Sequence, residues 1–433
     1  MSKLAIFGGK AVRTKLFDPY NTIGVEERKA VDEVLKSGVL SKYLGSWHPD
    51  FFGGPKVQEH EKLWSEKVGV KHSISVNSNT SGLITAMGAI GIKPGDEVIV
   101  SPFSMSASAI APIFWGGVPV FVDIDETNFC ISPKSIEKRI TERTKAILVV
   151  HIFGHSAQMD EIMEIANRKG LYVVEDVAQA PSGMYKGRHL GSIGHLGIFS
   201  LNYHKHIHTG EGGIITTNDN RLAERCQLIR NHGETVVEAK GVDEIDNIFG
   251  FNFRMTEIES AIGIEQLKKL DVLVEQRIKN AEYLSSNLQS IPYFDVCIPP
   301  TYVKHNYYQQ PIRYFADKNQ GLHRDKYLKA ISAEIPSSVM REKDPLIAGG
   351  YVKPLYLQPI YQKKAFNLYN YNPNNLNYAK GICPVVEKMH YHELITHEFM
   401  RPSMSKSDLD QVIEAFFKVD KYMDEIIARQ DEL

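Results

Sequence analysis

A short stretch in the middle of the chain crowds three histidines around one lysine, ahead of a glycine-rich turn. The segment SLNYHKHIHTGEGG covers residues 200–213, and its lysine is Lys205. Such a segment could hold a metal through its imidazoles, bind a phosphate at its turn, or present an amine that forms a Schiff base with an aldehyde. An exposed lysine on an ordinary loop is the plainest alternative.

The spacing gives a metal site little support. Alternating histidines share one face if the segment is a strand, but no cysteine or carboxylate stands at ligand spacing beside them, and HExxH is absent. We therefore expect no metal at these positions. The histidines are His204, His206 and His208.

A second segment places polar residues where a strand is expected to end and a helix to begin. After the apolar run HSISV comes NSNTSGL, which opens a helical pattern. Free N–H groups at a helix start, with hydroxyls beside them, form an anion site. The same residues also serve as ordinary N-caps. The candidates here are Ser78, Asn79, Thr80 and Ser81.

Two further segments carry a carboxylate and amides. VVEDVAQA ends an apolar strand at Asp176, with Gln179 three residues later. A carboxylate there suits a metal, a base proton or a protonated ring nitrogen, or it caps the next helix. A buried charge needs a cationic partner, because desolvation is costly. FGFNFRMTEIESAIG places Asn252 and Arg254 where they reach an anion or a neighbouring subunit, or cap a helix.

Strand and helix patterns alternate between about residues 70 and 220. The runs HSISVNS, DEVIVSP, VPVFVDI, KAILVVHIFG, LYVVEDVA and GIFSL predict buried strands, and IITTN follows the glycine turn. Stretches such as QMDEIMEIANRKG predict helices between them. The alternation predicts an α/β fold with a mostly parallel central sheet, and ligands bind at the carboxyl ends of such strands.

Past residue 255 the pattern changes. Residues 255–290 have Leu, Ile and Val at helical spacing and predict a long linking helix. YYQQPIRYFA and the final SKSDLDQVIEAFFKVDKYMDEII predict a smaller α+β domain. For 433 residues we expect two domains. Residues 1–255 hold the N-terminal segment and the large domain, and residues 256–433 hold the linking helix and the small C-terminal domain.

Composition excludes several classes of protein. The formal net charge of −2 gives no electrostatic case for nucleic acid as a partner. Four scattered cysteines without a CxxC pattern indicate reduced thiols. The N-terminus lacks the apolar run of a signal peptide, and no apolar stretch is long enough to span a bilayer. A soluble cytoplasmic protein is therefore expected.

Taken in order, the segments match a pyridoxal phosphate (PLP) site. A helix-start anion site, a strand-end Asp and a Lys before a glycine turn suit its phosphate, ring nitrogen and aldehyde. The chain here resembles the DegT/StrS family of PLP-dependent aminotransferases, which has the aspartate aminotransferase fold (fold type I). The resemblance covers nearly the full length. FGGKAVRT, VNSNTSGL, GDEVIVSPFSMSASA, GGVPVFVDID, VEDVAQA, FSLNYHKHIHTGEGG and FGFNFRMTEIESAIG follow in family order.

The resemblance implies a role for each of these polar residues. Lys205 is the Schiff-base lysine and proton carrier, Asp176 contacts the ring nitrogen, and Gln179 lies beside the ring near its phenolic oxygen. Asn252 matches an asparagine that reaches the phosphate from the other subunit of a homodimer with shared active sites. Met105 stands where many relatives stack an aromatic residue on the cofactor, and a thioether can pack there. The remaining phosphate contacts are Asn79, Thr80, Ser81 and Ser200.

The resemblance also implies a reaction. An amino group passes from glutamate or glutamine to a polyhydroxylated ketone, in sugar or cell-surface polysaccharide biosynthesis. The ketone is a nucleotide-linked ketosugar or a ketocyclitol, and the GG-x-x-VR opening and PLYLQP look most like members acting on ketocyclitols. A PLP-binding sensory protein without turnover and a sugar dehydratase of the same superfamily stay open as alternatives. Some of those dehydratases replace the lysine with histidine, so Lys205 favours transamination.

Two loops are expected to form the substrate mouth, SKYLGSWHPDFF and PLYLQPIYQKK. Their hydroxyl, amide and aromatic groups suit a sugar or cyclitol, and lysines in or beside them could add a phosphate contact. Alternatively, the loops only cover the cofactor. The residues concerned are Ser41, Lys42, Tyr43, Trp47, His48, Lys353, Tyr356, Gln358, Tyr361 and Lys363.

Overall fold

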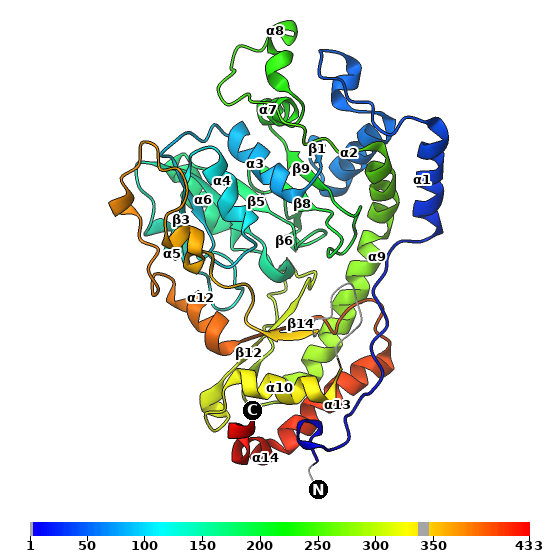
Figure 1. Ribbon diagram of the computed structural model, residues 1–433, viewed down its shortest axis with the longest axis vertical. Helices are drawn as coiled ribbons and strands as arrows, with labels where there is room; N and C mark the ends of the chain where they lie inside the picture. The colour runs from blue at the N-terminus through cyan, green and yellow to red at the C-terminus, as the bar shows by residue number, and fades with distance from the viewer. Residues whose placement is uncertain (1–2, 337–345) are drawn as a thin grey trace.

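The computed structural model describes residues 3–336 and 346–433, and it has two lobes joined by one long helix (Figure 1). Helix α9 (Glu257–Leu288) begins at a capping box formed by Thr256 and Glu259. Its first half packs into the core of the upper lobe through Leu267 and Leu270, and its second half packs into the core of the lower lobe through Leu284 and Leu288. The helix therefore belongs to both hydrophobic cores.

The upper lobe contains a seven-stranded sheet in the order β1-β9-β8-β5-β4-β2-β3. All of its pairings are parallel except the two that β9 makes. The strands are buried along almost their whole length, which explains their unbroken Val and Ile runs. The predicted, mostly parallel sheet is confirmed. Its strands are β1 (His72–Val76), β2 (Glu97–Val100), β3 (Val118–Phe121), β4 (Thr144–Val150), β5 (Tyr172–Asp176), β8 (Leu196–Ser200) and β9 (Gly213–Thr217).

Helices pack against this sheet and hold the loops at its carboxyl ends. Helix α3 (Asn79–Ala89) is buried along most of its length, because it lies between the sheet and α4 and α7. Its sequence is accordingly apolar around most of the helix. The other helices in contact with these strands are α2 (Pro55–Val68), α4 (Ala107–Phe114), α6 (Met159–Lys169) and α7 (Asn220–Arg230).

The lower lobe is built on an antiparallel four-stranded sheet in the order β10-β12-β14-β13. A second hydrophobic core forms between this sheet and its helices. The smaller α+β region expected near the C-terminus is confirmed. Its elements are β10 (Phe294–Asp295), β12 (Gln310–Tyr314), β13 (Ile347–Gly349), β14 (Leu394–His397), α10 (Arg324–Glu334), α13 (Lys406–Lys421) and α14 (Met423–Ala428).

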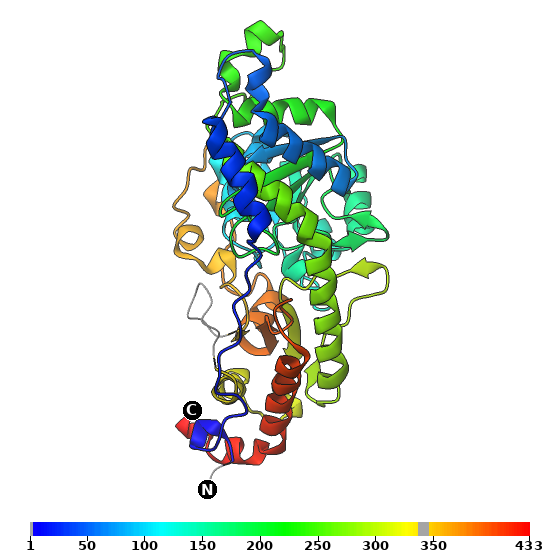
Figure 2. The same ribbon diagram turned by 90° about the vertical axis from the view of Figure 1, so that its right-hand side faces the viewer.

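The domain division after residue 255 stays a prediction, and two segments pack across it. The N-terminal segment runs up the molecule from the lower lobe to α1 (Val25–Ser37), as Figure 2 shows, and buries Leu4 and Phe17 in the lower core. Conversely, residues 354–389 follow the lower-lobe strand β13 but pack on the upper core. None of the helices that the structure describes combines the length and apolar character needed to cross a bilayer.

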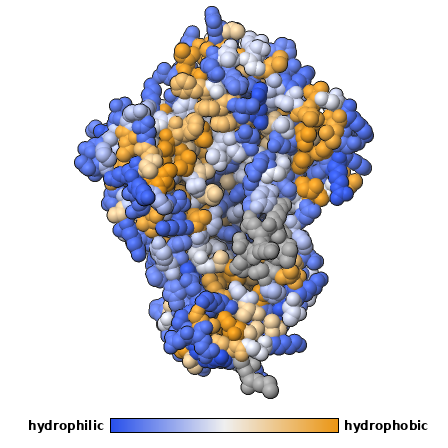
Figure 3. Space-filling view, in the orientation of Figure 1, coloured by the Kyte–Doolittle hydropathy of each residue, from blue (hydrophilic) through white to orange (hydrophobic). Residues whose placement is uncertain are grey.

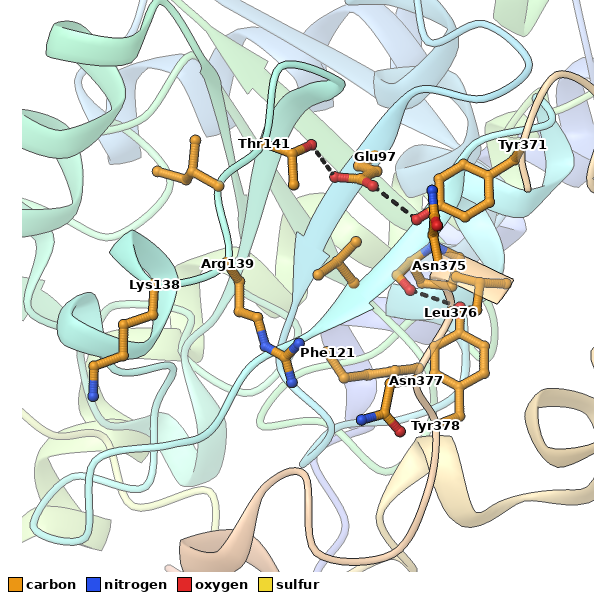
Figure 4. Close-up of a pocket in the computed structure, with 13 residues that line it drawn as sticks. Glu97, Phe121, Lys138, Arg139, Thr141, Tyr371, Asn375, Leu376, Asn377 and Tyr378 are labelled. Carbon is orange, nitrogen blue, oxygen red and sulfur yellow. Dashed lines mark hydrogen bonds between the residues drawn. The ribbon is translucent and has the colours of Figure 1, made fainter. Parts of the chain in front are cut away.

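The segment 354–389 covers β3 at the edge of the large sheet, which corrects its expected place at a substrate mouth. Tyr356 and Tyr361 are fully buried, and both rings contact Phe121 of β3. Further along, Tyr371 donates a hydrogen bond to Glu97 (2.8 Å), and Tyr378 donates one to the carbonyl of Pro119 (2.8 Å) (Figure 4). The segment thus protects an edge strand from pairing with other chains.

Tyr361 provides a test of this structural role. Its ring is fully buried in an aromatic cluster, and its hydroxyl has no hydrogen-bond partner among the described residues. Tyr361→Phe should therefore leave the stability to urea unchanged or slightly raised, whereas Tyr361→Ala should lower the free energy of unfolding by about 3–5 kcal/mol. Urea denaturation followed by fluorescence measures both. A large loss of stability in Tyr361→Phe would contradict the assignment.

Candidate active site

A cavity of about 530 Å³ opens at the carboxyl ends of the central strands. The pairing register brings these ends together: Val76 of β1 and Ser200 of β8 both lie opposite Gly213 of β9, and Asp176 of β5 lies beside Ile198 of β8. Residues that follow β1, β5 and β8 in the sequence therefore meet at one place. The cavity shares no lining residue with the small polar pocket of about 210 Å³ at the edge of β3 (Figure 4).

The start of α3 forms one wall of the cavity. Ser78 caps the helix, since its side chain accepts the backbone N–H of Ser81 (3.0 Å). Ser78, Asn79 and Thr80 line the cavity, so the positive end of this helix faces it. The glycine that begins β9 allows this helix start to approach the strand closely. A Cβ on Gly213 would come within 2.7 Å of the Asn79 backbone nitrogen.

Asp176 is buried at the end of β5 and is contacted by neutral donors. Its Oδ2 accepts the Ser108 hydroxyl (2.9 Å), and its Oδ1 accepts the backbone N–H of Ala178 (3.1 Å) and the Asn79 amide (3.4 Å). Burial raises the pKa of the Asp176 carboxyl above its ordinary value, against these hydrogen bonds. Among the described residues no cation contacts this carboxylate directly, and a protonated ring nitrogen would supply one. The cavity therefore fits a pyridoxal phosphate ring.

Lys205 faces the same cavity and lies beside Tyr308. Its Nζ lies 3.5 Å from the Tyr308 hydroxyl and 4.6 Å from the centre of that ring. Burial lowers the pKa of the Lys205 ammonium, while Tyr351 and Asp176 raise it. Tyr351 is held by Gln179, whose Nε2 donates to its hydroxyl (2.8 Å), and burial raises the pKa of Tyr351 to about 12. An amine with a lowered pKa is more often unprotonated and so more nucleophilic.

The three histidines around Lys205 have separate surroundings. His206 is buried and donates from Nε2 to the carbonyl of Asn306 (3.2 Å), and burial holds its pKa well below the ordinary range. His208 accepts the backbone N–H of Gly210 at Nδ1 (3.3 Å), and His204 is exposed and lines the cavity. Over residues 3–336 and 346–433, no group of three His, Cys, Asp or Glu side chains could hold a metal ion.

Seven of the nine residues predicted to bind the cofactor line the cavity: Asn79, Thr80, Met105, Asp176, Gln179, Ser200 and Lys205. Ser81 does not, because its hydroxyl turns to the Asn77 side chain (2.6 Å), and Ser78 lines the cavity in its place. Asn252 also lies outside the cavity of its own chain. It is exposed, and its Oδ1 accepts the Arg254 guanidinium (2.7 Å).

The expected substrate mouth is wrong for this chain's own cavity. No residue of SKYLGSWHPDFF or PLYLQPIYQKK lines it. The first stretch is held elsewhere by Asn231, whose amide donates to the carbonyls of Leu44 (2.8 Å) and Phe51 (3.1 Å). Tyr43 is buried, with the Arg230 guanidinium 4.9 Å from its ring centre. Local polarity suggested these residues, but tertiary packing placed them away from the cavity.

Four residues from the lower lobe close the cavity, and no sequence pattern predicted them. Tyr308 and Gln309 directly precede β12, Tyr351 comes two residues after β13, and Glu398 directly follows β14. All four lie at ends of strands in the antiparallel sheet. Their sequences carry no motif, so the signal that could have found them is their position next to predicted strand ends.

Comparison with known proteins agrees with this geometry. A family model, the DegT/DnrJ/EryC1/StrS aminotransferase family, matches residues 21–417. The spore coat polysaccharide biosynthesis protein SpsC of Bacillus subtilis is 35% identical over 409 residues, covering 92% of this chain and 96% of that protein. A Micromonospora echinospora protein named as a proposed L-glutamine:3-amino-2,3-dideoxy-scyllo-inosose aminotransferase is 34% identical over 333 residues, covering 77% of this chain and 78% of its own.

Among solved structures, an aminotransferase from Psychrobacter cryohalolentis matches with a TM-score of 0.80 and 28% identity, over 94% of this chain and 99% of that chain. The fold and the cavity together define a pyridoxal phosphate-dependent aminotransferase of fold type I. The chain belongs to the DegT/DnrJ/EryC1/StrS aminotransferase family. The resemblance inferred from the sequence is thereby confirmed.

The environment of Lys205 predicts how its amine titrates. In the protein without cofactor, burial should let Lys205 lose its proton at a lower pH than an exposed lysine does. Asp176→Asn should lower that pH further, because it removes a negative charge that favours the ammonium. The measurement is the pH dependence of Lys205 labelling by an amine-reactive reagent, read by peptide mass spectrometry. A midpoint in Asp176→Asn at or above the wild-type value would contradict this account.

Proposed function

We propose that the enzyme transfers an amino group from glutamine or glutamate to a polyhydroxylated ketone, with Lys205 as the residue that carries the cofactor. Asp176 would hold the ring nitrogen, and Gln179 would lie near the phenolic oxygen. The start of α3, with Thr80 and Ser200, would hold the phosphate. Met105 would pack against the ring. These roles agree with the places of the residues around the cavity.

The residues around Lys205 account for the proton steps of such a reaction. Bound pyridoxal phosphate supplies an aldehyde that takes up the amino group and a ring that accepts electron density. Lys205, once released by the amino donor, moves the proton at the donor's α-carbon, and its lowered pKa leaves more of this amine unprotonated, as a base must be. Tyr308, whose hydroxyl lies 3.5 Å from the Nζ of Lys205, keeps this amine oriented in the cavity. Asp176 keeps the ring nitrogen protonated, because a nearby carboxylate favours the cation.

The character of the cavity wall carries the assignment of the acceptor. Among the residues that the structure describes, no arginine lines the cavity and Lys205 is its single lysine. Enzymes for simple keto acids hold carboxylates with guanidinium groups, since the two match in geometry. Hydroxyls and amides instead suit the hydroxyl groups of a sugar or cyclitol. The lining offers Ser78, Thr80, Ser104, Ser200, Asn202, Tyr203, Tyr308, Gln309 and Tyr351.

A homodimer with shared active sites would complete the cavity. Met105 lines the cavity but is 62% exposed, so one side of the site is open in a single chain. Apolar side chains on and after α1 are also exposed, and Figure 3 shows an apolar patch in this part of the molecule. The exposed residues there are Val25, Leu35, Val39, Leu40 and Leu44. Asn252, outside its own cavity, would then reach the partner's cofactor.

Subunit mixing tests the shared site. Lys205→Ala and Asn252→Ala should each be inactive, because one lacks the amine and the other lacks a contact with the neighbouring cofactor. A refolded equimolar mixture should regain about a quarter of wild-type activity, since half of the dimers are hybrids with one intact site in two. Mass spectrometry of the native protein establishes the exchange. A mixture that stays inactive despite proven exchange would refute the shared site.

The acceptor class can be tested by competition. Pyruvate and oxaloacetate should be aminated with lower kcat/KM than ketosugars, nucleotide-linked ketosugars or inososes, because the cavity offers hydroxyl and amide partners rather than guanidinium groups. The readout is the loss of the aminated cofactor's absorbance on addition of each ketone. The highest kcat/KM for a simple keto acid would disprove the acceptor assignment.

A further inference from the structure

We propose that Glu398 selects the amino donor, and that its carboxylate recognises the primary carboxamide of glutamine and disfavours the second carboxylate of glutamate. Glutamine and glutamate both give up their α-amino group, so an enzyme can distinguish the two donors only by the end of the side chain. This inference rests on the aminotransferase function proposed above and names its donor.

Glu398 lines the cavity that holds the reacting amine. It directly follows β14 and lines the same cavity as Lys205. Its negative charge is one of those that raise the pKa of Lys205, beside Tyr351 and Asp176. An amino donor must bring its own amine to the position that Lys205 serves, so the rest of the donor must lie in this cavity. Of the two carboxylates that act on Lys205, Asp176 is already assigned to the cofactor.

Arg401 fixes one oxygen of this carboxylate and leaves the other open. Arg401 donates from Nε (2.9 Å) and from Nη2, and both bonds go to Oε2 of Glu398. No donor in the described parts of the chain reaches Oε1. An oriented carboxylate oxygen with free lone pairs can accept an N–H of a carboxamide. It offers no donor to a second carboxylate and repels it.

The balance of charge in the cavity points the same way. Its described lining contains the carboxylates of Asp176 and Glu398 against the single ammonium of Lys205, whereas the carboxylate of Glu211 is exposed and screened by water. The cofactor phosphate would add further negative charge. Glutamine brings one carboxylate and one ammonium group, whereas glutamate brings an additional negative charge. Like charges in a partly desolvated cavity disfavour each other, so the neutral side chain is preferred.

Glu211 offers a matched comparison within the same cavity. Its carboxylate accepts the Asn202 amide (2.9 Å) in an exposed position. Among the carboxylates that line the cavity, those of Asp176 and Glu398 are the ones that raise the pKa of Lys205. Removing the charge of Glu211 therefore changes the total charge of the cavity by the same amount as removing that of Glu398. The Glu211 substitution leaves the carboxylate of Glu398 unchanged.

The donor half of the reaction can be measured without knowing the ketone. The cofactor-loaded enzyme is mixed with L-glutamine or L-glutamate, and the change in cofactor absorbance gives kcat/KM for each. The wild type should prefer glutamine by about tenfold or more, the scale of one hydrogen bond to a charged group. Glu398→Gln should lower that ratio by about tenfold, because its amide can donate to a carboxylate. Glu211→Gln should leave the ratio unchanged within about twofold.

A binding measurement separates recognition from turnover. Calorimetry gives the Kd of both amino acids for Lys205→Ala and for Lys205→Ala/Glu398→Gln, which cannot carry out the transfer. The Kd of glutamate divided by the Kd of glutamine, which measures the preference for glutamine, should fall in the double variant by a factor similar to that for kcat/KM. Circular dichroism shows whether Glu398→Gln is folded, since the substitution deprives Arg401 of its ion pair. If Glu398→Gln is not folded, Glu398→Asp replaces it. A lower ratio of the kcat/KM for glutamine to that for glutamate in Glu398→Asp then supports the proposal, and an unchanged ratio overturns it.

The outcomes distinguish this proposal from the function on which it rests. A wild-type enzyme that reacts with no amino acid would overturn the aminotransferase proposal itself. A wild-type enzyme that reacts but prefers glutamate would overturn the donor selection alone. So would a donor ratio that is the same in wild type and Glu398→Gln.

Discussion

The carboxylate of Asp176 and the ammonium of Lys205 are both removed from water at the carboxyl ends of β5 and β8, and both lobes of the structure are needed to keep water away from them. Burial raises the pKa of Asp176 and lowers that of Lys205, so both groups are displaced towards their neutral forms. The donors around Asp176 are neutral, which keeps its carboxylate available for a cation. Such shifts need a site with little water, because water would solvate both charges and restore their ordinary pKa values.

The second lobe supplies the cover that makes this possible. The large sheet alone leaves its carboxyl edge open, and the antiparallel sheet closes it with Tyr308, Tyr351 and Glu398. Helix α9 fixes the distance between the two sheets because it is buried in both cores. The N-terminal segment strengthens the connection by burying Leu4 and Phe17 in the lower core before it reaches α1. Rigid linkage of this kind holds side chains from two lobes around one amine.

The sequence predicted the half of the site that local patterns encode. Asp176 and Ser200 end apolar strands, and Asn79 opens a helix, so their convergence follows from the rule that parallel strands share a carboxyl edge. Tyr351 and Glu398 come from short antiparallel strands whose docking depends on tertiary packing, so no local pattern marks them. Polarity alone misled at Tyr356 and Tyr361. Tyrosine is as suitable for a buried aromatic cluster as for a sugar site. Here the rings pack on Phe121 of the edge strand β3, a long-range contact that the local sequence does not reveal.

Two walls of the cavity, one from each lobe, have opposite electrostatic character, and this limits what can bind there. At the upper wall, the start of α3 offers backbone N–H groups and hydroxyls, which attract an anion without any charged side chain. At the lower wall, Arg401 binds Oε2 of Glu398 and leaves Oε1, which no donor in the described parts of the chain reaches. A ligand that places a phosphate at the start of α3 and N–H or O–H donors at Glu398 is matched by both walls. A ligand with an anionic group at each wall is attracted at α3 and repelled at Glu398, so the cavity favours the first kind of ligand over the second.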